Sequence, residues 1–256
     1  YFYPGLGANL PEYGKSGSEL QLQVPSELRG RFFRSDPMKL FLDTANIEEI
    51  RQGAQMGVLT GVTTNPSLAA KEGIGRPEAY RLAVQEISDI IDGPISVEVV
   101  SQDAAGMIAE GREIAEWIPN PWVKIPSTTD GFEAISVLSK DGINCNQTLC
   151  FSVNQAVLGA QAGSTVVSPF VGRLDDIGQE GMDLVADIVS VFGSYGIKTM
   201  VMAASIRHSL HCFLAAKAGA DIATVPYGVL RQMAQHPLTD SGVARFLEDW
   251  QKAGGA

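Results

Sequence analysis

Short apolar, β-prone runs alternate with amphipathic helical segments along most of the chain. Eight such runs have the length of strands, at residues 39–45, 61–65, 95–100, 122–126, 143–149, 165–170, 198–205 and 222–226. The segments between them predict helices at 47–56, 77–91, 104–117, 131–139, 153–162, 181–192 and 210–218. Strand–helix alternation indicates an α/β protein with a parallel sheet, and eight units predict closure into a (β/α)8 TIM barrel. A doubly wound open sheet is the alternative, but no GxGxxG follows the first strand.

The predicted helices begin and end with recognisable signals. Asn46 precedes a first turn with two glutamates, and Pro77 stands at a first helical position. A last amphipathic helix at 243–250 places Phe246, Leu247 and Trp250 on one apolar edge. We expect this edge to cover the bottom of the barrel or to pack on a neighbouring subunit.

Residues 1–37 differ from the rest of the chain because they are rich in Gly, Pro, Ser and Glu and show no sustained period. We interpret them as an N-terminal extension, either a non-native or a disordered segment. The barrel is therefore expected to occupy residues 38–256.

Composition narrows the classes of protein to consider. The chain has 256 residues and a formal net charge of -10, which argues against a nucleic-acid-binding protein. No apolar run is long enough to span a membrane, and no signal-peptide pattern is visible. The three cysteines, Cys145, Cys150 and Cys212, form no metal-binding motif and favour free thiols in the cytoplasm.

One predicted strand, Trp122-Val123-Lys124-Ile125-Pro126, has a lysine in the middle of an apolar run. Burying an unpaired ammonium carries a large desolvation penalty. Burial of an amine lowers its pKa, and the neutral amine is the form that attacks carbonyls to make Schiff bases. Lys124 is therefore a candidate nucleophile, and a strand-end lysine that reaches solvent is the alternative.

Polar residues also stand late in the other apolar strands, where TIM barrels place their active sites. They include Asp43, Glu98 and Thr148. Because side chains alternate along a strand, these three converge if their faces of the strands point into the barrel. This set suits carbon–carbon bond cleavage through a Schiff base. Asp43 would take a hydroxyl proton, while Glu98 would act through a water that Thr148 also holds.

Two arginines late in the chain, Arg173 and Arg207, suit a substrate phosphate because guanidinium binds phosphate in a fork. A surface ion pair is the alternative interpretation for both arginines, and for Arg173 the aspartates Asp175 and Asp176 are close in sequence.

Six motifs resemble the transaldolase family, in particular its short single-barrel subgroup, which includes fructose-6-phosphate aldolase. The resemblance covers about residues 38–252 and rests on the segments Leu42-Asp43-Thr44-Ala45-Asn46, Gly61-Val62-Thr63-Thr64-Asn65-Pro66-Ser67, Val123-Lys124-Ile125-Pro126, Ser168-Pro169-Phe170-Val171-Gly172-Arg173-Leu174-Asp175-Asp176, Ala203-Ala204-Ser205-Ile206-Arg207-His208 and His236-Pro237-Leu238-Thr239-Asp240.

The resemblance implies a class I enzyme that uses no metal and no cofactor. It would move a dihydroxyacetone unit from sedoheptulose 7-phosphate to glyceraldehyde 3-phosphate in the non-oxidative pentose phosphate pathway. In the family's pattern Lys124 forms the Schiff base, Asp43 is the acid/base, and Glu98 and Thr148 hold the catalytic water. Asn65 and Asn146 would bind donor hydroxyls or steady the lysine, and Ser168 would also contact the donor. Arg173, Ser205 and Arg207 would bind the phosphate. The family also implies a homodecamer of two pentameric rings, joined in part through the C-terminal helix.

Two positions separate transfer from plain aldol cleavage within the resemblance. The aldolase subgroup has a glutamine where Glu98 stands and a tyrosine where Phe170 stands. A tyrosine hydroxyl can help protonate the enamine and release free dihydroxyacetone, and a phenylalanine cannot. The sequence therefore favours a transaldolase over a fructose-6-phosphate aldolase, and a catalytically silent ring-forming scaffold is the non-enzymatic alternative.

Overall fold

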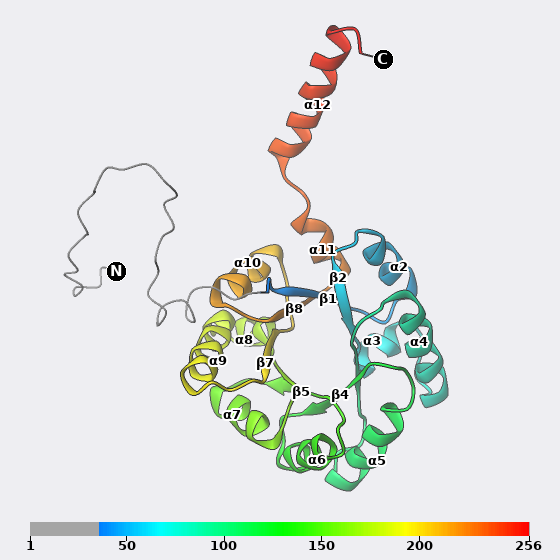
Figure 1. Ribbon diagram of the computed structural model, residues 1–256, viewed down its shortest axis with the longest axis vertical. Coiled ribbons are helices and arrows are strands. Elements are labelled where there is room, and N and C mark those ends of the chain that lie inside the picture. Colours follow the sequence, from blue (N-terminus) through cyan, green and yellow to red (C-terminus); the bar gives the residue numbers. More distant parts are fainter. Residues whose placement is uncertain (1–35, 256) are drawn as a thin grey trace, which may run out of the picture. The chain divides into compact units, whose positions relative to one another are not determined.

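Eight parallel strands, hydrogen-bonded in the order of the chain, close into a barrel in the computed structural model of the protein (Figure 1). The structure describes residues 36–255, so the predicted extension lies outside the described residues except for its last two positions. The (β/α)8 prediction is confirmed, and the open-sheet alternative is wrong because β1 pairs with both β2 and β8.

All eight predicted strands are present, with ends that differ by a few residues. They are β1 (Lys39–Asp43), β2 (Leu59–Thr63), β3 (Ile95–Glu98), β4 (Pro121–Pro126), β5 (Cys145–Cys150), β6 (Val166–Pro169), β7 (Met200–Ala203) and β8 (Ile222–Val225). The predicted runs overshoot at their carboxyl ends in several strands because polar loop residues such as Ser205 follow the strand in sequence without pairing in the sheet.

The predicted helices correspond to α2 (Ile47–Gln55), α4 (Pro77–Ile90), α5 (Ala104–Ile114), α6 (Thr129–Lys140), α7 (Val153–Ala162), α9 (Gly181–Tyr195), α10 (Ser209–Ala218) and α12 (Pro237–Lys252). Asn46 caps α2 by accepting a hydrogen bond from the backbone of Glu49, as its position predicts. Three short helices were not predicted, α3 (Pro66–Lys71), α8 (Val171–Asp175) and α11 (Tyr227–Met233). None of the three is longer than two turns, so they show too little periodicity to be recognised from sequence.

Apolar side chains form two layers, one on each side of the strands. The inner layer fills the barrel and consists of Phe41, Trp122, Val166, Met202 and Ile222, with Met200 packed against it. The outer layer lies between the strands and the surrounding helices and is much larger. Because side chains alternate along a strand, the residue two places after an inner-layer residue also faces the barrel interior, closer to the carboxyl end. Asp43 follows Phe41 in this way, and Lys124 follows Trp122.

Helix α12 is longer than the sequence pattern predicted and buries no residue. Its apolar side chains are exposed, including Leu238, Val243, Phe246, Leu247 and Trp250. Packing of this helix on the barrel bottom is therefore not observed. No helix of residues 36–255 is both long and apolar enough to cross a membrane.

Candidate active site

Lys124 lies at the centre of the polar ends of three neighbouring strands. In the strand register, Lys124 is paired with Glu98 of β3 on one side and with Asn146 of β5 on the other. The Nζ atom is 3.0 Å from Oε2 of Glu98 and donates a hydrogen bond of 3.2 Å to the backbone carbonyl of Thr64. The lysine side chain is 5% exposed, so the ammonium is paired inside the barrel and does not extend to bulk solvent. The structure thus rejects the solvent-reaching alternative.

A cavity of about 320 Å³ opens at the carboxyl ends of the strands. Eight of the residues predicted for the site line it: Asp43, Asn65, Lys124, Ser168, Phe170, Arg173, Ser205 and Arg207. The other three are not part of its surface. Glu98 and Asn146 contact the lining residues Lys124 and Ser168, and Thr148 is buried two residues beyond Asn146 on β5. The volume falls within the usual range for small-molecule sites.

Asp43 is held by a chain of hydroxyl groups across the barrel. Thr63 donates to Oδ1 of Asp43 at 2.7 Å, and the hydroxyl groups of Thr63 and Thr224 are 2.6 Å apart. Because the single Thr63 proton goes to the carboxylate, Thr224 is the donor in the second bond. Burial raises the pKa of Asp43 above its usual value, and Glu98 raises it further, while Lys124 and the Thr63 hydrogen bond oppose this. A carboxyl with a raised pKa is suited to exchange a proton with substrate.

Asn146 orients the groups beside Lys124. It donates to the Ser96 hydroxyl at 3.0 Å and accepts a hydrogen bond of 2.6 Å from Ser168. Thr148, two residues further along β5, is fully buried, and its hydroxyl has no hydrogen-bond partner among the described residues. A buried hydroxyl without a partner is unusual, and it is available to bind a small polar molecule.

The Phe170 ring lies close to two cations of the cavity, Lys124 and Arg173. Its ring centroid is 6.0 Å from Nζ of Lys124 and 5.1 Å from the guanidinium carbon of Arg173. Phe151 packs edge-on against the same ring. Phe170 thus presents an apolar ring to both cations, and it offers no hydroxyl at this wall of the cavity.

The alternative interpretation, a surface ion pair, is wrong for Arg173 but is observed for Arg207. Within residues 36–255, Asp176 instead pairs with Arg207 at 2.8 Å, and Asp175 pairs with His211. Arg173 remains at the cavity wall, stacked on Phe170. The local sequence suggested the wrong partners because α8 turns Asp176 toward the loop after β7 and Asp175 toward α10.

Backbone hydrogen bonds join helix α8 to the loop between β7 and α10. The amides of Val171 and Gly172 donate to the carbonyls of Ala204 and Ser205 at 3.0 Å each. A Cβ at position 172 would lie 2.2 Å from the Ser205 carbonyl oxygen and 2.5 Å from Nε of Arg207, so only glycine fits. Ser205 adopts a left-handed conformation with φ of 58°, which turns the chain toward Arg207.

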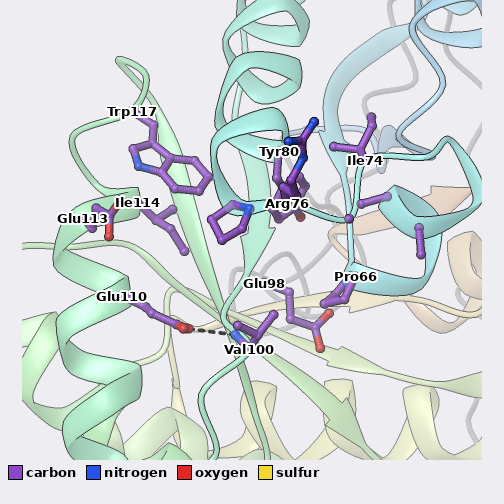
Figure 2. Close-up of a pocket in the computed structure, with 14 residues that line it drawn as sticks. Pro66, Ile74, Arg76, Tyr80, Glu98, Val100, Glu110, Glu113, Ile114 and Trp117 are labelled. Carbon is purple, nitrogen blue, oxygen red and sulfur yellow. Dashed lines mark hydrogen bonds between the residues drawn. The ribbon is translucent and has the colours of Figure 1, made fainter.

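A second cavity, of about 390 Å³, lies behind Glu98 and is largely apolar. Figure 2 shows Glu98 at one end of this pocket, with Ile114 and Trp117 towards the other. Glu110 closes one side by accepting hydrogen bonds from the backbone amides of Val100 and Ser101. The Lys124–Glu98 pair therefore joins the linings of two cavities, the lysine in one and the carboxylate in the other.

Charge in the first cavity is opposite to the charge of the whole chain. Four cations, Lys71, Lys124, Arg173 and Arg207, line it together with one carboxylate, Asp43. A chain of net charge -10 with a cavity of this composition is suited to an anionic small molecule.

Four polar or charged residues that line this cavity were not among the predicted site residues: Lys71, Ser67, Thr63 and Thr224. The first two lie on α3, a helix that was not predicted. Thr224 had a detectable signal, since it is the one polar side chain in the strand Ile222–Val225. Within the described part of the chain, no group of three or more His, Cys, Asp or Glu side chains is placed to hold a metal ion.

Comparison with known proteins identifies the family. The family model described as transaldolase/fructose-6-phosphate aldolase matches residues 40–256. A probable transaldolase of Dehalococcoides mccartyi is 60% identical over 215 residues, which are 84% of this chain and 98% of the relative. Probable transaldolases of Caldicellulosiruptor saccharolyticus and Thermoanaerobacter sp. are 58% and 57% identical, over 84% and 85% of this chain and 98% and 99% of their own. The chain belongs to the transaldolase/fructose-6-phosphate aldolase family.

Proposed function

We propose that this protein is a transaldolase that moves a dihydroxyacetone unit between sugar phosphates through a Schiff base on Lys124. The observation that carries the proposal is the position of Nζ of Lys124. It is buried beside Glu98 and lines a cavity that also holds Asp43 and two arginines. Sedoheptulose 7-phosphate and glyceraldehyde 3-phosphate are the proposed donor and acceptor, in the non-oxidative pentose phosphate pathway.

Formation of the Schiff base requires two protons to move over short distances. Lys124 gives the first proton to Glu98, 3.0 Å away, and its neutral amine attacks the ketose carbonyl. The attacking nitrogen then loses a second proton, which a water molecule relays to the former carbonyl oxygen to give the carbinolamine hydroxyl. Glu98 returns the first proton to this hydroxyl, so that water leaves and the protonated C=N bond forms. The partnerless hydroxyl of Thr148 supports its role, with Glu98, in holding the relay water.

Bond cleavage follows from proton removal by Asp43. The carboxylate takes the proton of the C4 hydroxyl, the C3–C4 bond breaks, and an aldehyde leaves while the electron pair enters the enamine on Lys124. A second aldehyde then takes up the dihydroxyacetone unit by the reverse steps. The Thr224–Thr63–Asp43 hydroxyl chain keeps the carboxylate in place during this exchange.

Substrate contacts divide between the two ends of the cavity. Asn65 and Ser168 are proposed to bind donor hydroxyls, and Asn146 steadies Ser168. The Asn65 carbonyl already caps α3 at Leu68, so its NH₂ group is the part that faces substrate. Arg173, Ser205 and Arg207 are proposed to bind the phosphate.

The assembly is proposed to be a homodecamer of two pentameric rings, and the cytoplasm the proposed location. Helix α12 supports self-association because its five large apolar side chains are exposed and an amphipathic helix normally buries its apolar stripe. The three cysteines are free and buried, as in a reducing compartment. Light scattering tests the assembly, and a monomeric mass would contradict it.

The test of the chemistry is reductive trapping. Incubation with fructose 6-phosphate followed by borohydride is expected to add the sugar mass to Lys124. Lys124→Ala should form no adduct and lose activity, while Lys71→Ala, which removes another lysine of the cavity, should still be trapped. Absence of the adduct together with full activity of Lys124→Ala would refute a Schiff-base enzyme. Abundant free dihydroxyacetone without an acceptor aldehyde would favour the aldolase over the transaldolase.

A further inference from the structure

A buried histidine outside the cavity contacts the backbone of the proposed phosphate loop. His211, on α10, is 5% exposed. Its Nδ1 accepts a hydrogen bond of 3.3 Å from the backbone amide of Arg207. Its Nε2 lies 3.0 Å from Oδ2 of Asp175 on α8. The other carboxylate oxygen of Asp175 accepts from the amide of Gly181 at the start of α9, so Asp175 is itself fixed.

These partners determine which ring nitrogen bears the proton. The Arg207 amide can only donate, so Nδ1 must keep its lone pair. The proton of the neutral ring is therefore on Nε2, where the Asp175 carboxylate accepts it. A second proton would have to enter at Nδ1, directly opposite the Arg207 N–H. The doubly protonated ring is thus incompatible with the hydrogen bond to Arg207.

The hydrogen bond matters because the turn at 205–207 has few other supports. Ser205 is in the left-handed region, and its carbonyl is held by the Gly172 amide. The Arg207 amide is held by His211 alone among the hydrogen bonds of the described residues. The Arg207 side chain is 51% exposed and pairs with Asp176. The direction in which Arg207 faces the cavity therefore depends on where its backbone is fixed.

We propose that His211 is a positioning residue whose neutral ring, protonated on Nε2, holds the turn at 205–207 in the geometry that recognises a substrate phosphate. This inference rests on the proposed function, because it assigns the phosphate end of the same cavity. His211 itself does not line that cavity and touches no substrate.

The surroundings of His211 keep it neutral. The charged and titratable groups that face the ring are Asp175 from α8, and His208 and Arg207 from the loop before α10. Among the described residues, no charged group of α9, α11 or β8 shifts the pKa of this ring. Burial lowers the pKa of His211 below 6.5, and His208, with its ring centroid 3.8 Å away, lowers it further, while Asp175 opposes both. The hydrogen bond is therefore intact at neutral pH and is lost only under acidic conditions.

Two substitutions separate the two ring nitrogens. In His211→Asn the side-chain oxygen takes the place of Nδ1 and still accepts from Arg207. In His211→Gln the amide nitrogen takes the place of Nε2 and still donates to Asp175, but no acceptor remains for Arg207. The two variants are similar in polarity, neither titrates, and they differ in the one bond that the inference requires.

The assay is borohydride trapping over a range of substrate concentrations, with fructose 6-phosphate and with unphosphorylated dihydroxyacetone. At pH 7.5 we expect His211→Gln to raise the half-saturating concentration of fructose 6-phosphate about fivefold, the change that about 1 kcal/mol produces. The value for dihydroxyacetone should change less than twofold, and His211→Asn should resemble the wild type with both substrates.

Acidification provides a second comparison that does not depend on the folding of His211→Gln. As the pH falls and the His211 ring takes up a second proton, the half-saturating concentration of fructose 6-phosphate should rise more in the wild type than in His211→Asn. The substrate phosphate titrates equally in both measurements, and the excess should reach about fivefold once an NMR titration shows the wild-type ring to be doubly protonated. Equal half-saturating concentrations with that ring doubly protonated, or a His211→Gln defect that is equal for both substrates, would overturn the inference. A wild-type enzyme that forms no adduct with either ketose would overturn the proposed function first, and the inference with it.

Discussion

Replacing Glu98 with glutamine tests the step on which the mechanism depends most. The change keeps the shape and one acceptor oxygen but removes the charge and the ability to carry a proton. At 3.0 Å and an effective dielectric constant of about 20, the Lys124–Glu98 attraction is about 5–6 kcal/mol before desolvation is subtracted. Because the amide still accepts a hydrogen bond, we expect the free energy of unfolding to fall by only about 1.5–3 kcal/mol.

The effect on chemistry should be larger than the effect on stability. A positioned general acid/base contributes roughly 10²–10⁴ in rate, so Glu98→Gln should slow Schiff-base formation at least about 100-fold. Rapid-quench borohydride trapping with fructose 6-phosphate measures this rate directly, and thermal unfolding shows that the variant is folded. Glu113→Gln is the matched control, since Glu113 lines the same second cavity and its substitution removes the same charge. Trapping by Glu98→Gln at the wild-type rate would refute the proton transfer assigned to Glu98.

The resemblance to the aldolase subgroup extends this experiment. That subgroup pairs glutamine and tyrosine at the positions of Glu98 and Phe170. Adding Phe170→Tyr to Glu98→Gln is therefore expected to raise the rate of Schiff-base formation about tenfold above that of Glu98→Gln alone. The double variant should also release free dihydroxyacetone, and a double-mutant cycle measures the coupling. Purely additive losses would mean that the two positions do not act together.

Two further substitutions test the proposed phosphate end and the acid/base. Gly172→Ala places a methyl group against the Ser205 carbonyl and Arg207. It should lower the free energy of unfolding by about 1–3 kcal/mol and weaken the binding of phosphorylated substrates specifically. Gly193→Ala, in α9 with no atom within 4 Å of the added carbon, should be neutral, and equal effects of the two on kcat/KM would contradict the close approach. Asp43→Asn should abolish transfer yet raise stability at pH 7 by about 0.5–2 kcal/mol, measured by denaturant unfolding. The reason is that the pKa of Asp43 is raised by burial, so its ionisation opposes folding as the pH rises above 3.8; an advantage that persists below pH 3.8 would contradict this cause.

Much of the barrel and its site was predictable because the signals are local. Strand–helix alternation and eight apolar runs specify the closed parallel sheet, and alternation along each strand directs Asp43 and Lys124 to the same side as Phe41 and Trp122. Lys124 was recognisable for a simple physical reason, since an ammonium within an apolar strand requires a partner. The strand register supplies that partner, and Glu98 is directly opposite.

The remaining features depend on contacts between segments that are distant in sequence. Thr63 and Thr224 meet only because the barrel closes, and Asp176 pairs with Arg207 only because α8 lies against the loop after β7. No pattern in α10 distinguishes His211 from an ordinary buried histidine until Asp175 and the Arg207 amide are seen on either side of its ring.

The sequence by itself determined the barrel, the place of the buried lysine and the kind of groups gathered around it, because these follow from hydrophobic periodicity and from the cost of burying charge. Only the tertiary structure decided which carboxylate serves which cation, which threonines support Asp43 and how the loop that bears Arg207 is held. Those choices rest on hydrogen bonds a few ångströms long, and no periodic pattern in the sequence specifies them.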